Sequence, residues 1–162
     1  MRAPVLIVAI SLIAAATSAA DATPHPRSER GVTIASASDD SPGVLDAHAR
    51  RRHGEIVRRA LHDVLLRSGA DVRYAGIGAR QIDAAVVGWR VTQNAAQLSV
   101  SAELRVLVCD GRGKMLAIVT GRASVSSPAR GARLAEMREQ ALAEAVGAMS
   151  RSLPPAVALA TS

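Results

Sequence analysis

The sequence predicts an α+β fold, a two-layer sandwich with two long helices on one face of a mixed sheet that contains an antiparallel three-stranded meander. Apolar residues recur at helical spacing over residues 46–68 and 132–153, and three strand-like segments separated by short turns lie between them. The chain has 162 residues, of which 49% are hydrophobic and 21% charged, so it is too apolar for a disordered chain and suits a single domain.

The first part of this domain predicts one strand and one helix. Residues 31–37 alternate β-branched and small side chains before a turn cluster rich in Ser, Asp, Pro and Gly, which indicates a short strand. Asp46 is a good N-cap and Gly69 a stop signal, so a helix is expected over residues 46–68. One stripe of this helix is apolar and should face the core; it comprises Val57, Ala60, Leu61, Val64 and Leu65.

The middle of the chain predicts most of the sheet. Residues 71–74 favour a brief strand, and three longer strands are expected over residues 81–92, 97–109 and 115–125. The turns at residues 94–96 and 110–113 are too short for a parallel crossover, which needs a dozen or more residues. The three long strands should therefore form an antiparallel meander, with one face toward the helices and the other half polar.

The end of the chain predicts a second helix over residues 132–153, which Pro154 and Pro155 should terminate. Residues 31–153 then form the single domain, and residues 154–162 a flexible tail. We find no internal repeat that would indicate a repeat architecture.

The amino terminus has the features of an export signal. A positive start is followed by an apolar stretch from Val5 to Ala16 and by small residues at Ser18 and Ala20, which predicts cleavage after residue 20. An uncleaved anchor is the alternative. Residues 21–30 contain two prolines and predict a linker. We expect a periplasmic or extracellular protein with no membrane span after cleavage, and a net charge that falls from +6 to +5 because Arg2 is lost.

No pattern in the chain indicates catalysis, a cofactor or a metal site. His48, His53 and His62 lack the four-residue spacing of helical metal ligands, and Gly76-Ile77-Gly78 precedes a predicted strand instead of the helix that a nucleotide loop requires. Cys109 is the only cysteine and has no identifiable partner. An enzyme would need a site assembled from distant residues, such as a pocket that groups His53, Cys109 and a carboxylate.

Two strands have apolar residues on both faces, which suggests either buried edge packing or a partner surface. Strict alternation places Trp89 on one face with Val91, and Ile82 and Val86 on the other. In the last strand, Leu116 and Ile118 are expected on one face and Met115, Ala117 and Val119 on the other, and all five are apolar.

The sharpest polar feature is a basic ridge on the outward face of the first helix, which Arg50 and Arg52 extend near its start; its members are Arg51, Arg58, Arg59 and His62. This ridge is a candidate surface for a partner or for an anionic envelope polymer or lipid. The simpler alternative is a solvated face that the acidic residues of the last helix partly balance. Nucleic acid is not expected as a partner, because the protein is exported and has too few aromatic residues to stack on bases.

Two segments carry a resemblance to known proteins: Ile82-Asp83-Ala84-Ala85-Val86-Val87-Gly88-Trp89-Arg90-Val91 and Val106-Leu107-Val108-Cys109-Asp110-Gly111-Arg112-Gly113-Lys114-Met115-Leu116. Their pattern of apolar run, glycine, strand and Asp-Gly turn resembles periplasmic α/β domains of envelope-assembly proteins: the peptidoglycan-synthase activator lipoproteins, the curli-secretion lipoprotein and the amino-terminal domain of the Tol propeller protein. The resemblance implies a non-catalytic module that binds an envelope protein, and it transfers no active-site residue. The chain departs from the lipoproteins because no cysteine follows its signal.

Overall fold

The computed structural model describes residues 31–43, 45–73 and 80–158. The predicted signal and linker, residues 1–30, and the Gly76–Gly78 loop lie outside these ranges. In chain order the elements are β1 (Val32–Asp39), α1 (Ala47–Arg67), β2 (Val72–Arg73), β3 (Arg80–Gln93), β4 (Gln97–Asp110), β5 (Met115–Pro128), α2 (Leu134–Ala148), the short 3-10 helix η1 (Met149–Arg151) and α3 (Leu153–Ala158).

The strands form one mixed sheet in the order β2-β1-β3-β4-β5. β1 runs parallel to β2 and β3, whereas β3, β4 and β5 are antiparallel neighbours, so the predicted mixed sheet and its meander are confirmed. β2 has only two residues, and four longer strands make up most of the sheet. Side chains close both hairpin turns: Asn94 Oδ1 accepts from the amide of Gln97 at 2.8 Å, and Asp110 Oδ1 from that of Lys114 at 2.9 Å.

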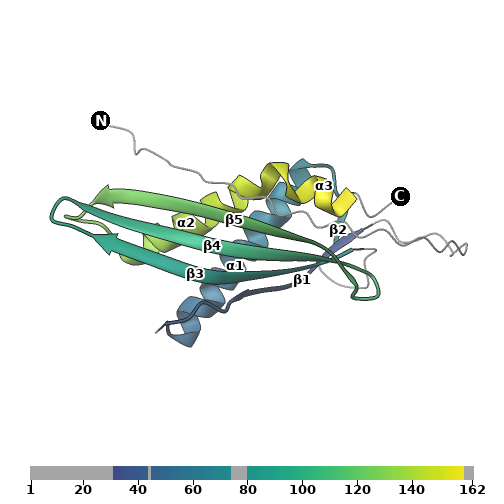
Figure 1. Cartoon of the computed structure of the whole chain (residues 1–162), viewed down its shortest axis with the longest axis horizontal. Helices are drawn as coiled ribbons and strands as arrows, with labels where there is room; N and C mark the ends of the chain where they lie inside the picture. The colour runs from purple at the N-terminus through teal and green to yellow at the C-terminus, as the bar shows by residue number, and fades with distance from the viewer. Residues whose placement is uncertain (1–30, 44, 74–79, 159–162) are drawn as a thin grey trace, which may run out of the picture.

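Both long helices pack on one face of this sheet, and Figure 1 shows them crossing behind the strands. The predicted cap of α1 is confirmed, because Asp46 Oδ1 accepts from the amide of Ala49 at 2.7 Å. The core lies between the helices and the sheet. Its fully buried side chains include Val57, Leu61 and Leu65 of α1, Ala141, Leu142 and Ala145 of α2, and Val100, Leu104, Val106 and Val108 of β4.

Two glycines allow close contact between helices and sheet. A Cβ atom on Gly54 of α1 would lie 2.5 Å from the carbonyl oxygen of Ala37 in β1. A Cβ atom on Gly121 of β5 would lie equally close, at 2.5 Å, to the carbonyl oxygen of Ala145 in α2. Real Cβ atoms do not approach backbone oxygen so closely, so a larger residue would push each helix away from its strand.

Trp89 and Val91 share a face as predicted, but the predicted separation of Trp89 from Ile82 and Val86 was wrong. A bulge interrupts the pairing of β3 with β4 between Val86 and Gly88, so that Val86 faces Leu104 while Trp89 faces Ala102. Between these pairs β3 advances by one residue more than β4, and this extra residue moves every later side chain of β3 to the opposite face. Trp89 therefore lies on the helix-facing side together with the apolar residues that precede the bulge, and it packs against the core.

The second helix is shorter than predicted. α2 ends at Ala148 and is followed by η1 and then α3, which contains Pro154 and Pro155 in its first turn. Proline is compatible with a first helical turn because its missing N–H would have no intrahelical partner there. The two prolines thus begin a new helix where a flexible tail was expected, and Val157 of α3 is buried.

Candidate functional site

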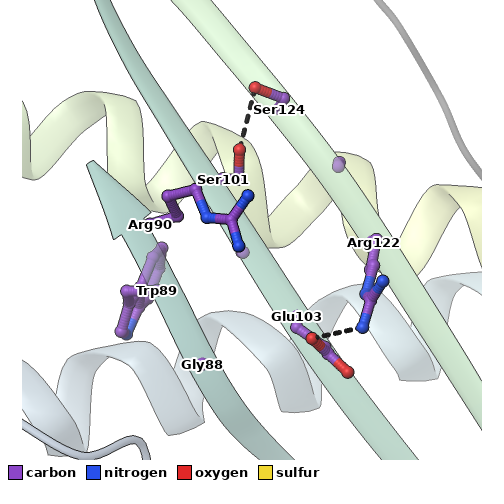
Figure 2. A pocket seen from close by; sticks show the side chains of 9 residues that line it. Gly88, Trp89, Arg90, Ser101, Glu103, Arg122 and Ser124 are labelled. Carbon is purple, nitrogen blue, oxygen red and sulfur yellow. Dashed lines mark hydrogen bonds and ion pairs between the residues drawn. The ribbon is translucent and has the colours of Figure 1, made fainter. Parts of the chain in front are cut away.

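The sheet face opposite the helices is not covered by any element that the structure describes. It is polar around Arg90 and Arg122, whereas Leu107 and the exposed Ile118 lie farther along the same face. Strand register aligns its side chains in rows across the sheet: Arg90, Ser101 and Ser124 form one row, and Gly88, Glu103 and Arg122 the next. Between these rows lies an open hollow of about 310 Å³. In Figure 2, Arg90 reaches from β3 over β4, between the serine pair and the Glu103–Arg122 pair.

The charges in this hollow leave one cation uncompensated. Arg122 Nη2 lies 2.8 Å from Glu103 Oε2. That hydrogen bond and the charge of Glu103 raise the pKa of Arg122. Arg90 is exposed and has no ion-pair partner within the described ranges. Two arginines thus stand against one carboxylate, and the hollow has a net positive charge.

A chain of serine hydroxyls borders the same hollow. Ser126 Oγ donates to Ser99 Oγ at 3.0 Å, and Ser101 Oγ donates to Ser124 Oγ at 3.0 Å. Ser99 and Ser124 are joined by a third hydrogen bond of 3.1 Å in which either hydroxyl can donate. These cross-strand contacts between β4 and β5 hold the hydroxyls in place, so the polar face is ordered by its own hydrogen bonds.

The predicted basic ridge is only partly assembled on α1. Arg51 and Arg59 are exposed and Arg58 is half-buried, and none of the three has an ion-pair partner in the part of the chain that the structure describes. The side chain of His62 is only 17% exposed, with Nδ1 3.6 Å from Asp63 Oδ1, so His62 lies at the margin of the ridge.

The two residues expected to extend the ridge have other partners. Arg52 Nε lies 2.6 Å from Glu139 Oε1 of α2. Arg50 donates to the carbonyl oxygens of Asp39 at 2.6 Å, Ser41 at 3.1 Å and Gly43 at 3.1 Å, and so fixes the connection between β1 and α1. The predicted neutralisation of the ridge by acidic residues of the last helix is therefore found for one arginine, Arg52, which pairs with Glu139.

A buried polar cluster that was not predicted lies at the end of β1. The side chain of Asp39 is fully buried, and its Oδ2 lies 2.6 Å from Nδ1 of the buried His53 and accepts from Trp89 Nε1 at 3.3 Å. Its Oδ1 accepts from both the hydroxyl and the amide of Ser41. The ring of His53 also packs against that of Trp89, with centroids 5.1 Å apart. The Asp-Asp-Ser turn cluster gave no sign that one of its two acids is buried.

The cluster contains Ser, His and Asp but is not arranged for nucleophilic catalysis. In a catalytic triad the imidazole lies between the carboxylate and the hydroxyl, so that it can take the proton of the serine. Here Asp39 lies in the middle and the hydroxyl of Ser41 donates to the carboxylate. The arrangement suits a structural role, because one buried acceptor satisfies donors from the β1–α1 connection, from α1 and from β3.

Cys109 does not join the buried cluster of Asp39 and His53. Cys109 pairs with Gln81 near the start of β3, whereas Trp89, beside the buried cluster, pairs with Ala102 seven residues earlier in β4. Burial, together with the negative charges of Asp83 and Asp110, raises the pKa of the Cys109 thiol. A thiol in this environment is a poor nucleophile, because the thiolate is the reactive form.

We expect Asp39 to make the stability of the protein sensitive to acid. Burial alone would raise the pKa of Asp39, but hydrogen bonds from Ser41, His53 and Trp89 outweigh it and hold the pKa below its ordinary value of 3.8. The ionised form therefore stabilises the fold above pH 4, and this contribution is lost as the pH falls through the lowered pKa of the folded state.

Urea unfolding at pH 5, 4 and 3, compared between the wild-type protein and Asp39→Asn, measures this contribution. The wild-type advantage should shrink steadily below pH 4. An advantage that stays constant down to pH 3 would show that folding does not lower the pKa of Asp39, and an advantage that grows would show that folding raises it.

Comparisons with known proteins assign no family: no family model matches the chain, and neither does any curated protein. Solved structures that align with it include a minor lipoprotein from Acinetobacter baumannii, with 10% identity over 80% of this chain and 93% of that chain and a TM-score of 0.48. A lipoprotein from Neisseria meningitidis has 13% identity over 75% and 99%, with a TM-score of 0.44. A hypothetical protein from Chlamydia trachomatis has 16% identity over 82% and 99%, with a TM-score of 0.49.

With identities of 10–16% and TM-scores of 0.44–0.49, the similarity of these structures to this chain is too low to assign a family, a location or an activity. None of the helices in the described ranges is both long and apolar enough to cross a membrane. The fold and the site define an α+β domain with one helical layer and one open polar sheet face.

Proposed function

We propose that this protein is an exported, non-catalytic accessory module that binds a protein partner in the bacterial cell envelope through its polar sheet face. The observation that carries the proposal is the hollow at Arg90 and Arg122 on a face that the helical layer leaves open. Arginine is enriched at the energetic centres of protein interfaces, and a rigid sheet presents such residues at little cost in conformational entropy.

The edge strand β5 supports the same role. It has 14 residues and is paired only with β4 among the described strands. Arg122 is its only charged residue, so the edge lacks the lysines and inward-pointing charges that usually prevent pairing with another chain. A partner bound to the polar face could therefore also add a strand along β5.

Site-specific photo-crosslinking in the native envelope tests this proposal. A benzoyl-phenylalanine at Thr120, in the middle of β5 on the polar face, should capture one discrete protein. The same group at Gln140, an exposed position on α2, serves as the matched control and should not capture it. The captured protein should also co-purify with the unmodified chain through a high-salt wash. Identical products from both positions, or no product from Thr120, would contradict the proposal.

An anionic envelope polymer bound by α1 is the second candidate. It is favoured by an open hollow of about 420 Å³ between β1 and α1, which Arg51 and Arg58 border. Glu55 also lines this hollow and reduces its positive charge. Binding of this kind depends on exposed charges, so a bound glycan or lipid should be lost in the high-salt wash that the protein partner survives.

A further inference from the structure

The charged side chains that line the hollow on the polar face have a net charge of one positive unit. Arg90 and Arg122 contribute two positive charges and Glu103 one negative charge, and Arg90 has no ion-pair partner among the described residues. A monoanion would neutralise the hollow. A dianion would leave the hollow with a net negative charge, with Glu103 within the same set of lining residues.

The serine chain beside the hollow has one hydrogen to spare. The four linked hydroxyls carry four hydrogens, and their three mutual hydrogen bonds use three of them. The remaining hydrogen belongs to Ser99 or to Ser124, depending on which of the two donates to the other. An acceptor in the hollow would favour donation from Ser99 to Ser124, because the hydroxyl of Ser124, which lines the hollow, is then free to bind it.

The shape and contacts of the hollow match a carboxylate. Glu103 already shows that a carboxylate oxygen can reach Arg122 at 2.8 Å. The hollow has free space above Gly88: a Cβ atom added there would have only Glu103 Cβ as a neighbour, at 4.0 Å. No aromatic ring among the described residues faces the hollow: Trp89 contributes to its lining, but its side chain turns to the helix side, where it packs against His53. The hollow thus lacks the flat apolar surface on which sugar rings stack.

We propose that this hollow binds the carboxylate of an acidic side chain on the partner protein, with Arg90 as the principal contact and Ser124 as a second donor. This inference rests on the proposed function, because it names the chemistry by which the partner is recognised. Charge-assisted hydrogen bonds between guanidinium and carboxylate are among the strongest in proteins and give directional recognition.

NMR titration of the exported chain with N-acetyl-glutamate N-methylamide tests the site directly. The probe should shift the side-chain Nε–H signal of Arg90 and the backbone signal of Ser124, while the neutral glutamine analogue should not. Arg90→Gln should weaken binding about tenfold, as expected for the loss of a charge-assisted contact. Arg105→Gln is the matched control, because Arg105 is an exposed arginine of β4 that does not line the hollow, and it should leave the affinity within about twofold.

Three outcomes would overturn this inference. Equal losses from the two arginine variants would indicate unspecific attraction to a basic surface. Binding of methyl galacturonoside at least tenfold tighter than the glutamate probe would indicate an acidic sugar in place of a protein side chain. Unchanged crosslinking at Thr120 in the Arg90→Gln protein would show that a partner binds without this contact, leaving the proposed function intact. Probe binding without any crosslinked partner would instead overturn the proposed function and support the carboxylate site.

Discussion

Replacing Asp39 by alanine should destabilise the protein by about 3–5 kcal/mol, the range expected when one partner of a buried charged network is removed. The substitution would leave Ser41, His53 and Trp89 without their common acceptor, at a site where the aspartate side chain is fully buried. Unsatisfied buried donors bear most of this cost. Urea unfolding, followed by circular dichroism, measures the change.

Asp40→Ala is the matched control for this prediction, because Asp40 is the next residue and is exposed. It should change the free energy of unfolding by no more than about 0.5 kcal/mol. Similar losses in both variants would mean that the turn sequence matters and that the buried cluster does not.

Replacing Gly54 by alanine should also be strongly destabilising, although alanine is the better helix former. The added Cβ would lie 2.5 Å from the carbonyl oxygen of Ala37, and neither backbone can move without disturbing the packing of α1 on β1. We expect a loss of about 2–3 kcal/mol, as is typical of overpacking in a close-packed interior.

Gly147→Ala provides a control of opposite sign. Gly147 also lies in a helix, α2, but a Cβ there would meet no atom within 4 Å. The substitution should stabilise the protein by up to about 1 kcal/mol through helix propensity alone. If Gly54→Ala were neutral or stabilising in the same unfolding assay, the close contact between α1 and β1 would not be a constraint on the fold.

Those parts of the fold that depend on local patterns could be predicted from the sequence. The cap at Asp46 and the apolar stripe of α1 define that helix, and both hairpins follow from short turns between alternating strands. The predictions that were wrong concern features that depend on tertiary contacts. The bulge near Val87 breaks an alternation that looks regular in sequence, and the turn after α2 has no strong stop signal before Pro154.

The candidate site was less predictable than the fold. The ridge residues Arg51, Arg58 and Arg59 share a helix, so their proximity is visible in the sequence. Arg90 and Arg122 come from different strands, and only the register of three strands places them around one hollow. The burial of Asp39 was equally hidden, because it results from contacts with Trp89, 50 residues away, and with His53 of the helix.

Trp89 makes the interface between the two layers optically observable. It is the only tryptophan of the chain, and it lies between the ring of His53 in α1 and the guanidinium of Arg138 in α2, whose central carbon is 5.7 Å from the ring centroid. Tryptophan emission therefore reports a single place, where both helices meet the sheet. In a refolding experiment, its time course would record when the helices dock on the strands, whereas far-ultraviolet circular dichroism would record when the backbone becomes regular.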